Sequence, residues 1–371
     1  MPVNAVPGNA PTEKALPEKA LPEEAAPQKA APGKAVTVAE LSESDLLTRI
    51  FPRLAMDSRH AAATLLGPGD DAAIVAAPDG RTVISIDTQV QDQDFRLQWP
   101  NGYRTTGFDV GWKAAAQNLS DINAMGATAT SMVVSLTLPR DTPVSWVEDL
   151  ADGLAAGIRK LGADSCSVAG GDLGRGREIS VSVAVLGTLS GGSPVLRSGA
   201  CPGDVLALAG TVGRAAAGLA LLESDAGIES LAPEQRKLVA LQCRPVPPLA
   251  AGPLARSGGA TAMLDISDGL LRDGARLARS SGVVLDLDPQ ALRQLSEGLE
   301  PASDLLNADP MEWVLAGGED HGLLATFPPG VQVPPGFTAI GSVQALGESE
   351  SPGIKIAGHA ADTGGWDHFA H

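Results

Sequence analysis

Short motifs built around aspartate, most of them with glycine, recur along the whole of this 371-residue chain. They are GPGDD (67–71), SID (85–87), NLSD (118–121), GGD (170–172), DISDG (265–269) and GGED (317–320). Carboxylates are rarely buried unless they are paired or bind a metal. Mg²⁺ prefers oxygen ligands and commonly shares them with substrate phosphates. The motifs therefore predict one composite cleft that holds several Mg²⁺ ions and a nucleotide.

The chain carries 27 basic and 44 acidic residues, which gives a formal net charge of −17. This excess of negative charge argues against nonspecific binding to nucleic acid or to an anionic membrane surface. It also means that an anionic nucleotide would bind readily only if cations bridged it to the protein. A nucleotide substrate would therefore make activity depend on a metal ion.

Composition predicts a globular protein of two domains in the cytoplasm. The chain is long enough to divide in two, and 44% of its residues are hydrophobic whereas only 3% are aromatic. Its longest apolar runs have the length of a strand and not of a membrane span, and its first residues lack the apolar run of a secretory signal. No CxxC pair occurs, which argues against zinc sites and disulfide frameworks. The cysteines are Cys166, Cys201 and Cys243.

Three regions are predicted along the chain. Residues 1–38 have regularly spaced prolines among Ala, Lys and Glu, a composition that prevents a continuous helix and builds no core, so we expect a disordered tail. Residues 39–192 alternate predicted helices and strands and form an N-terminal mixed α/β domain. After a Gly/Ser-rich stretch, residues 193–371 form a C-terminal α/β domain.

Hydrophobic periodicity and end signals predict the individual elements. The helices are 42–51, ended by Pro52, then 107–125, 143–161, 213–222, 248–256 and 270–280. The strands are 82–87, 131–138, 165–169, 179–189, 205–209, 261–265, 283–287, 323–327 and 337–343. The fold class is therefore α/β (α+β).

Two motifs lie on regular elements, which fixes the directions of their side chains. In the strand that contains SID, alternation puts Ser85 and Asp87 on one side and the flanking isoleucines on the other. In the helix that contains NLSD, Lys113, Gln117 and Asp121 are four residues apart and share one polar stripe. Aspartate is a poor helix former, so Asp121 should have a partner, and a solvated helix face is the alternative.

The remaining motifs follow or end predicted strands. The paired glycines of GGD would let backbone N–H groups approach a phosphate. In DISDG, Asp265 and Ser267 point to one side of a strand end, and Asp268 begins a helix. Each motif taken alone is also compatible with a turn or a helix cap. Candidate cations for phosphate groups are Lys113, Arg197, Arg214 and Arg244.

Sequence motifs of several other enzyme classes are absent from the chain. There is no HExxH metal motif, no Walker A GxxxxGK[ST] and no kinase HRD catalytic loop. Phosphoryl transfer tolerates the lack of an obvious base, because its transition state is stabilised mainly by positioning and charge.

A series of longer motifs resembles those of the thiamine-monophosphate kinase family, within the aminoimidazole ribonucleotide synthetase-like superfamily of ATP-dependent enzymes. The series is GPGDDAA, SIDT, KAAAQNLSDINAMGA, GGD, RSGACPGD, LDISDGL, LAGGEDHGL and GWDHF, and it extends over residues 40–369. The resemblance implies direct in-line phosphoryl transfer from ATP to thiamine monophosphate with several Mg²⁺ ions. It also implies a homodimer whose N-terminal mixed sheets form a barrel across the dimer, an ATP- and Mg²⁺-binding N-terminal domain, and a C-terminal α/β domain that completes the substrate site.

The same resemblance assigns roles to the residues that match the family's motifs. The implied Mg²⁺ ligands are Asp71, Ser85, Asp87, Asp121, Asp172, Asp265 and Asp268, of which Asp121, Asp172 and Asp268 are the implied catalytic residues. ATP would contact Gly171, Arg197 and Ser267, and thiamine phosphate would contact Asp94, Glu319 and Trp366. Two residues depart from the family pattern. Many relatives have a hydroxyl residue at the position of Ile86, and some have histidine at the position of Asp94.

Two other functions are compatible with the motifs. One is a sister ATP-dependent synthetase of the same superfamily, of the selenophosphate or purine-pathway type. The selenophosphate type would need a reactive cysteine or selenocysteine near the start, whereas the first cysteine here is Cys166. The other is a catalytically silent nucleotide-binding protein, and a turnover assay separates it from an enzyme.

Overall fold

The structure is a computed structural model that describes residues 35–68, 72–362 and 364–366. The chain divides into a unit Met1–Ala35 and a unit Val36–His371, and the description below concerns the second unit. The predicted disordered tail lies outside the described residues up to position 34. Val36 is already tied to the fold, because the N–H of Val144 donates to its carbonyl at 2.9 Å. In the described ranges, no helix combines the length and the apolar character needed to cross a membrane.

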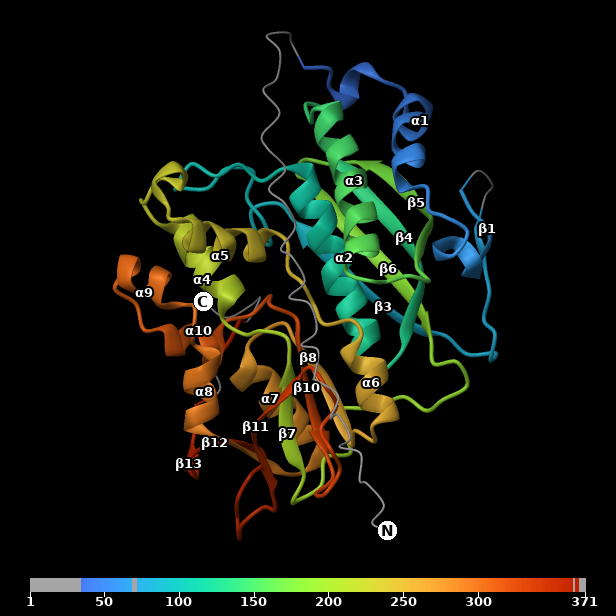
Figure 1. Cartoon of the computed structure of the whole chain (residues 1–371). Coiled ribbons are helices and arrows are strands. Elements are labelled where there is room, and N and C mark those ends of the chain that lie inside the picture. Colours follow the sequence, from blue (N-terminus) through green and yellow to red (C-terminus); the bar gives the residue numbers. More distant parts are fainter. Residues whose placement is uncertain (1–34, 69–71, 363, 367–371) are drawn as a thin grey trace, which may run out of the picture. The chain divides into compact units, whose positions relative to one another are not determined.

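The first half of this unit contains a four-stranded mixed sheet with two long helices on one face (Figure 1). The strand order is β3-β6-β4-β5, in which β4 and β5 are parallel and the other neighbours antiparallel. The strands are β3 (Val83–Val90), β4 (Thr128–Leu138), β5 (Ser167–Arg175) and β6 (Ser180–Thr188). The helices are α1 (Glu43–Leu54), α2 (Gly107–Ala124) and α3 (Val144–Lys160). A small separate sheet pairs β1 (Thr64–Leu66) with β2 (Ile74–Val75).

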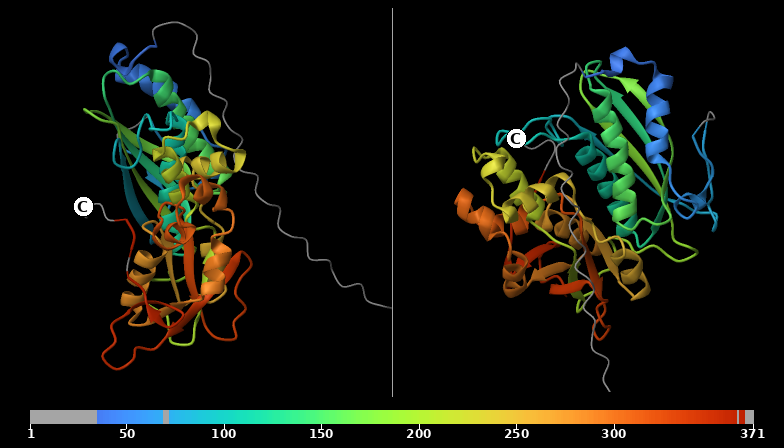
Figure 2. Two further views of the ribbon diagram at one scale, coloured as in Figure 1. Left: turned by 90° about the vertical axis from the view of Figure 1, so that its left-hand side faces the viewer. Right: turned by 45° about the horizontal axis from the view of Figure 1, so that its top comes forward.

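Helices α2 and α3 lie side by side over this sheet (Figure 2). Glycines determine how closely the two helices approach. A Cβ atom at Gly111 would lie 2.0 Å from the Leu150 carbonyl oxygen, and one at Gly153 would lie 2.1 Å from that of Phe108. Both distances are far below an ordinary contact. The two helix backbones therefore touch with no side chain between them at these points.

The second half contains a seven-stranded mixed sheet of order β13-β12-β9-β11-β7-β10-β8, in which β9 and β12 are parallel. The strands are β7 (Val205–Ala209), β8 (Ala262–Ile266), β9 (Val284–Leu287), β10 (Gly322–Phe327), β11 (Phe337–Gln344), β12 (Gly353–Ile356) and β13 (His359–Ala360). The helices are α4 (Arg214–Glu223), α5 (Pro233–Cys243), α6 (Ala251–Ser257), α7 (Leu270–Ser281), α8 (Pro289–Leu295), α9 (Glu300–Leu306) and α10 (Pro310–Ala316). The two sheets make a mixed α/β fold of two domains, as the predicted fold class requires.

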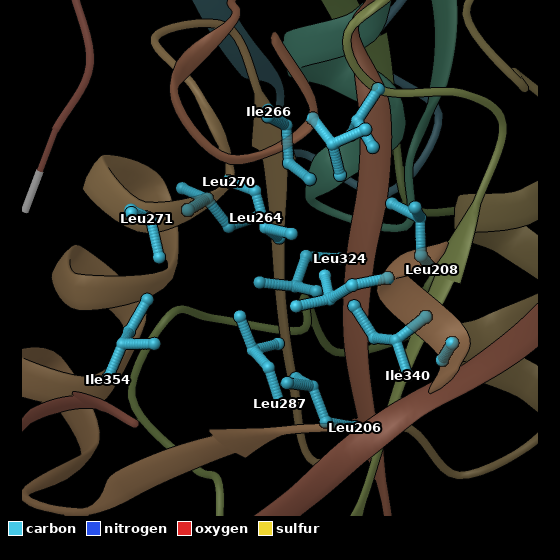
Figure 3. Packing of buried hydrophobic residues seen from close by; sticks show 14 of the residues in the cluster. Leu206, Leu208, Leu264, Ile266, Leu270, Leu271, Leu287, Leu324, Ile340 and Ile354 are labelled. Atoms are coloured by element: carbon cyan, nitrogen blue, oxygen red, sulfur yellow. The ribbon is translucent and has the colours of Figure 1, made fainter. Parts of the chain in front are cut away.

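Aliphatic side chains form the core of the second half. Strands β8 and β10 are buried along their whole length, as expected for continuous apolar runs covered on both faces. Figure 3 shows Leu208, Leu264, Leu324 and Ile340 gathered in one cluster with Leu270 of α7. This cluster fixes β8 and α7, and therefore the DISDG loop between them.

Two element predictions are wrong in detail. Helix α1 continues through Pro52 to Leu54, because a proline in the last turn removes only one helical hydrogen bond. The GGD motif lies inside β5 and not in a turn after a strand. A Cβ atom at Gly171 would lie 2.1 Å from the Val134 carbonyl oxygen, so close approach of β4 by itself accounts for this glycine. Helices α5, α8, α9 and α10 have no counterpart among the predicted elements.

Candidate active site

Helix α2 contacts both the four-stranded sheet and the second half, and its polar side chains point into the protein. The hydroxyl of Thr106 caps its start by accepting the Asp109 N–H at 3.2 Å. Lys113, Asn118 and Ser120 are 4%, 1% and 0% exposed. The alternative of a solvated polar face is therefore wrong. Buried polar groups need hydrogen-bond partners, and those partners include residues that the sequence motifs predicted.

Strand β3 and helix α2 bring the first site residues together. The Ser85 hydroxyl donates to Asp121 Oδ2 at 2.5 Å. Asp87 lies two residues further along β3, on the same side of the strand. The opposite side carries Ile84 and Ile86, which are 66% and 64% exposed. The predicted alternation is therefore confirmed, and the SID motif presents its polar side to α2.

A third carboxylate reaches this group from the second half. Asp265 is the last but one residue of β8 and is 5% exposed. Its Oδ2 atom accepts the Ser120 hydroxyl at 3.2 Å and lies 3.6 Å from Nδ1 of His321. His321 directly follows the GGED motif, and this adjacency was the one sequence signal that could have identified it. The SID, NLSD and DISDG motifs therefore meet beside α2.

Burial and mutual repulsion raise the pKa values of these acids. Burial first, then the charges of Asp265 and Asp87, raise the pKa of Asp121 to about 7. Burial also raises the pKa of Asp87, an effect that His321 opposes and Asp265 reinforces. A cation bound beside these carboxylates would relieve the repulsion. The donors are hard oxygens, so this set fits Mg²⁺, which commonly takes one or two carboxylates together with water and phosphate.

The described residues do not complete a metal site by themselves. Within the ranges that the structure describes, no three His, Cys, Asp or Glu side chains are close enough to hold one ion. Asp71, a predicted ligand, lies outside the described residues. An ion bound beside Asp121 would therefore also need oxygens from water or substrate.

The DISDG loop places Asp268 just before α7. The N–H groups of Ser267 and Asp268 donate to Asp273 Oδ2 at 3.0 and 2.8 Å, so the first turn of the helix fixes the loop. Arg276 Nη1 lies 2.6 Å from Asp268 Oδ2 and 2.6 Å from Asp273 Oδ1. The N–H of Trp366 donates to the Asp268 carbonyl at 3.0 Å. Three predicted site residues thus lie together, supported by an aspartate and an arginine that sequence reasoning missed.

The two acidic residues of GGED point in different directions. Glu319 Oε1 lies 2.5 Å from Lys113 Nζ, and its Oε2 accepts from Gln242 Nε2 at 2.5 Å. Asp320 instead accepts the Thr211 hydroxyl at 2.8 Å and an N–H at the start of α4 at 3.0 Å. Only Glu319 therefore faces the predicted site. Gln242 belongs to α5, which was not predicted, so nothing in the sequence pointed to it.

Lys113 also connects the two acidic residues predicted to bind thiamine phosphate. Its Nζ donates to the Asp94 carbonyl at 3.3 Å. Partial burial raises the pKa of Glu319, but the charge of Lys113 and the hydrogen bonds from Lys113 and Gln242 outweigh it and lower that pKa. Another candidate phosphate-binding cation, Arg244, is buried in an ion pair with Asp109 at 3.2 Å. Both cations therefore serve carboxylates of the protein itself.

Asp172 lies on the opposite face of the four-stranded sheet from Asp87. In the strand registers, Asp172 belongs to a row of side chains that crosses the sheet through Ser135 to Thr88. Thr88 and Asp87 are successive on β3 and so point to opposite faces. Gly171 and Asp172 line a cavity of about 700 Å³ whose lining also includes Ile86 of β3, Ala184 of β6 and residues of β4, α1 and α3. A single chain therefore does not bring Asp172 to the group around α2.

Arg197 lies apart from Ser267, with which it is predicted to contact ATP. Its carbonyl accepts the Ser281 hydroxyl at 2.9 Å. Ser281 is the last residue of α7, whereas Ser267 precedes the first. At about 1.5 Å per residue, this 12-residue helix separates its two ends by roughly 17 Å. The backbone of Arg197 thus lies at the far end of α7 from the DISDG loop.

Known proteins resemble this chain over most of its length. The family model of the AIR synthase related protein N-terminal domain matches residues 69–189. Over 294 residues the chain is 47% identical to a thiamine-monophosphate kinase of Mycobacterium tuberculosis, which covers 79% of this chain and 84% of that protein. The crystal structure of thiamine-monophosphate kinase from Stenotrophomonas maltophilia has a TM-score of 0.69 and 30% identity, covering 88% of this chain and 99% of that chain. The structure of AaThiL complexed with AMPPCP and TMP has a TM-score of 0.68 and 29% identity, covering 91% of this chain and 100% of that chain.

Proposed function

Because the chain belongs to the thiamine-monophosphate kinase family, we propose that it moves a phosphoryl group from ATP directly to thiamine monophosphate, with Mg²⁺ ions held by the carboxylates beside α2. The chain is an ATP-dependent kinase that converts thiamine monophosphate to thiamine diphosphate. The direct route, the metal and the roles of individual residues are the proposed part.

One observation carries the mechanism. Asp87, Asp121 and Asp265 come from both halves of a protein of net charge −17 and meet beside one helix. Such a concentration of buried negative charge is costly unless cations compensate it. ATP and thiamine monophosphate are both anionic, so bringing them together there would be more costly still. Divalent cations shared between protein and phosphates resolve both problems.

The residues around the carboxylates hold them in place before any ligand arrives. Bound Mg²⁺ would shield and orient the phosphate oxygens. Ser85 fixes Asp121 through its hydroxyl hydrogen bond, Ser120 does the same for Asp265, and Arg276 holds Asp268. Such supporting contacts orient metal ligands and reduce the reorganisation that the reaction requires. In-line transfer then depends on position and charge.

The contacts predicted for each substrate stay part of the proposal. ATP would contact Gly171, Arg197 and Ser267, and thiamine phosphate would contact Asp94, Glu319 and Trp366. The second set has support from the fold, because Asp94 and Glu319 share Lys113 and Trp366 hydrogen-bonds to the DISDG loop. Asp121, Asp172 and Asp268 are the proposed catalytic residues.

Cysteine chemistry supports direct transfer without a covalent intermediate. Burial raises the pKa of the Cys166 and Cys243 thiols to about 12, so neither is an activated nucleophile at neutral pH. All three cysteines are free in the structure. Free thiols suit the reducing cytoplasm, which is the location that we propose.

We further propose a homodimer formed through the exposed face of the four-stranded sheet, with a barrel across the dimer. Ile84, Ile86 and Val133 are large apolar residues on this face, and they are 66%, 64% and 37% exposed. Exposed apolar patches often mark interfaces. Asp172 lies on the same face, so dimerisation would bring it to the interface. Analytical ultracentrifugation of Ile86→Lys, which should dissociate the dimer, tests this assembly.

The activity assay measures ADP and thiamine diphosphate from the purified full-length chain. We expect ADP formation to require both thiamine monophosphate and Mg²⁺ and to equal thiamine diphosphate in amount. Removal of the metal with EDTA should stop turnover, and added Mg²⁺ should restore it. ATP consumption indifferent to thiamine monophosphate would overturn the proposal in favour of a sister synthetase. Tight ATP binding without turnover would indicate a non-catalytic protein.

A further inference from the structure

We propose that Lys113 and Gln242 are positioning residues that hold the Glu319 carboxylate in the orientation that thiamine monophosphate requires. The inference rests on the proposed role of Glu319 in substrate binding. It assigns to Lys113 a task different from the phosphate binding that its charge suggests. It predicts that loss of either residue weakens binding of thiamine monophosphate and leaves ATP binding unchanged.

The contacts fix both oxygens of the carboxylate. Lys113 Nζ lies 2.5 Å from Oε1, and Gln242 Nε2 donates to Oε2 at 2.5 Å. The two donors come from different helices, α2 and α5, so the carboxylate cannot rotate without losing one of them. An ionised carboxylate has about four acceptor positions. Two positions thus stay open to donors on a ligand.

The same ammonium group fixes a second predicted substrate residue. Lys113 Nζ donates to the Asp94 carbonyl at 3.3 Å, and Asp94 Oδ2 accepts the Val90 N–H at 2.7 Å. Asp94 belongs to the segment after β3, whereas Glu319 belongs to the loop before β10. Lys113 therefore sets the spacing between two residues that come from different halves of the chain.

Lys113 and Gln242 are buried, whereas the Glu319 carboxylate that they hold is partly exposed. The side chains of Lys113 and Glu319 are 5% and 34% exposed, and Gln242 is 3% exposed. Oε1 of Gln242 is buried and has no hydrogen-bond partner among the residues that the structure describes, so the contact with Glu319 orients this amide. Lys113 and Gln242 are thus too enclosed to meet a substrate themselves, while Glu319 is accessible.

The loop backbone is held independently of these side chains. The Glu319 N–H donates to the Ser267 carbonyl at 2.9 Å, and the His321 N–H donates to the Ile266 carbonyl at 3.1 Å. Asp320 anchors the loop to the start of α4. Loss of Lys113 or Gln242 should therefore leave the loop in place and free only the Glu319 side chain. An intact loop with a mobile Glu319 side chain is what distinguishes a positioning role from a purely structural one.

The test compares Lys113→Met and Gln242→Met with the matched control Lys355→Met. Lys355 forms a partly exposed pair with Glu350 at 2.7 Å on β12. Steady-state kinetics give KM for each substrate and kcat, and thermal denaturation reports folding. We expect Lys113→Met to raise KM for thiamine monophosphate about tenfold or more, a loss of one charge-assisted contact. KM for ATP and kcat should change less than about threefold, and Lys355→Met should resemble the wild type.

A double variant makes the inference falsifiable even if folding is affected. If Lys113 acts through Glu319, then the double variant Lys113→Met with Glu319→Gln should lose less binding of thiamine monophosphate than the sum of the two single losses, expressed as free energies. Any loss beyond that of Glu319→Gln alone reflects the contact of Lys113 with Asp94. Additive losses, or an equal rise in KM for ATP, would overturn the inference. If Lys113→Met does not fold, Gln242→Met and its double variant with Glu319→Gln decide by the same criterion. A wild-type protein without thiamine monophosphate-dependent turnover would instead refute the proposed function itself.

Discussion

Replacement of Gly111 by alanine tests whether backbone contact between α2 and α3 determines both stability and activity. The added Cβ would lie 2.0 Å from the Leu150 carbonyl oxygen, and an ordinary contact begins at 3.4 Å. The helices would have to separate by about 1.4 Å at this point, because a backbone carbonyl cannot rotate away as a side chain can. Gly157→Ala is a graded control, since its Cβ would meet the Ala115 methyl group at 2.8 Å.

The expected magnitude follows from two opposing effects. Overpacking a core costs about 1–3 kcal/mol, and the unyielding carbonyl places Gly111→Ala at the upper end of that range. Replacing glycine by alanine inside a helix stabilises the folded state by about 1 kcal/mol. The net loss for Gly111→Ala is therefore about 2 kcal/mol. For Gly157→Ala the two effects are each about 1 kcal/mol and nearly cancel.

Urea denaturation measures the difference in the free energy of unfolding. The fluorescence of Trp112, which lies beside Gly111 and is 1% exposed, reports on this interface. Activity should fall as well, because a shift of about 1 Å in the helix that carries Lys113 and Asp121 can cost about 100-fold in rate. If the free energies of unfolding of the two glycine variants differ by less than about 0.5 kcal/mol, the helices are not in backbone contact at Gly111 and the reasoning is refuted.

Three further substitutions and one control, Arg49→Met, test the site and its support. Asp121→Asn should lower kcat/KM more than about 100-fold without lowering the unfolding midpoint, because it removes a proposed metal ligand and relieves the repulsion between neighbouring carboxylates. Near-normal activity would make this residue structural. Trp366→Ala should raise KM for thiamine monophosphate about 3- to 10-fold through the loss of one stacking contact, whereas an unchanged KM would remove Trp366 from the site. Arg244→Met should lower the free energy of unfolding by about 3–5 kcal/mol, because it leaves Asp109 buried without its cation. Arg49→Met removes a more exposed ion pair with Glu148 and should lower the free energy of unfolding by less than about 1 kcal/mol. Equal losses in the Arg244 and Arg49 variants would contradict the larger effect expected for the buried pair.

The parts of the site that depend on local geometry could be predicted from the sequence. A strand has a side-chain period of two, so the direction of Ser85 and Asp87 follows from the sequence once the strand is recognised. The helical position of Asp121 follows in the same way. The apolar runs that form β8 and β10 have no competing helical pattern, which explains why both strands were predicted to within a residue or two.

The parts that depend on packing between distant segments could not be predicted. The sequence pattern predicts a turn for GGD, and the pairing of β5 with β4 decides instead that Asp172 belongs to a strand and faces away from Asp87. Lys113 is paired with Glu319, and Asp268 with Arg276. Glu319 in turn accepts a hydrogen bond from Gln242. Each contact depends on how separate elements meet in the folded chain. Charge alone suggested that Lys113 binds phosphate, whereas tertiary contact gives it a carboxylate.

In the loop that contains Glu319, Asp320 and His321, consecutive side chains reach three separate parts of the fold. Glu319 meets α2 and α5, Asp320 meets α4, and His321 approaches Asp265 of β8. Glu319 and His321 adopt φ values of 66° and 54°, and the successive side chains point in different directions. An inserted or deleted residue would disturb all three contacts at once. A change in the length of this segment should therefore disturb more contacts than the replacement of any one of its side chains.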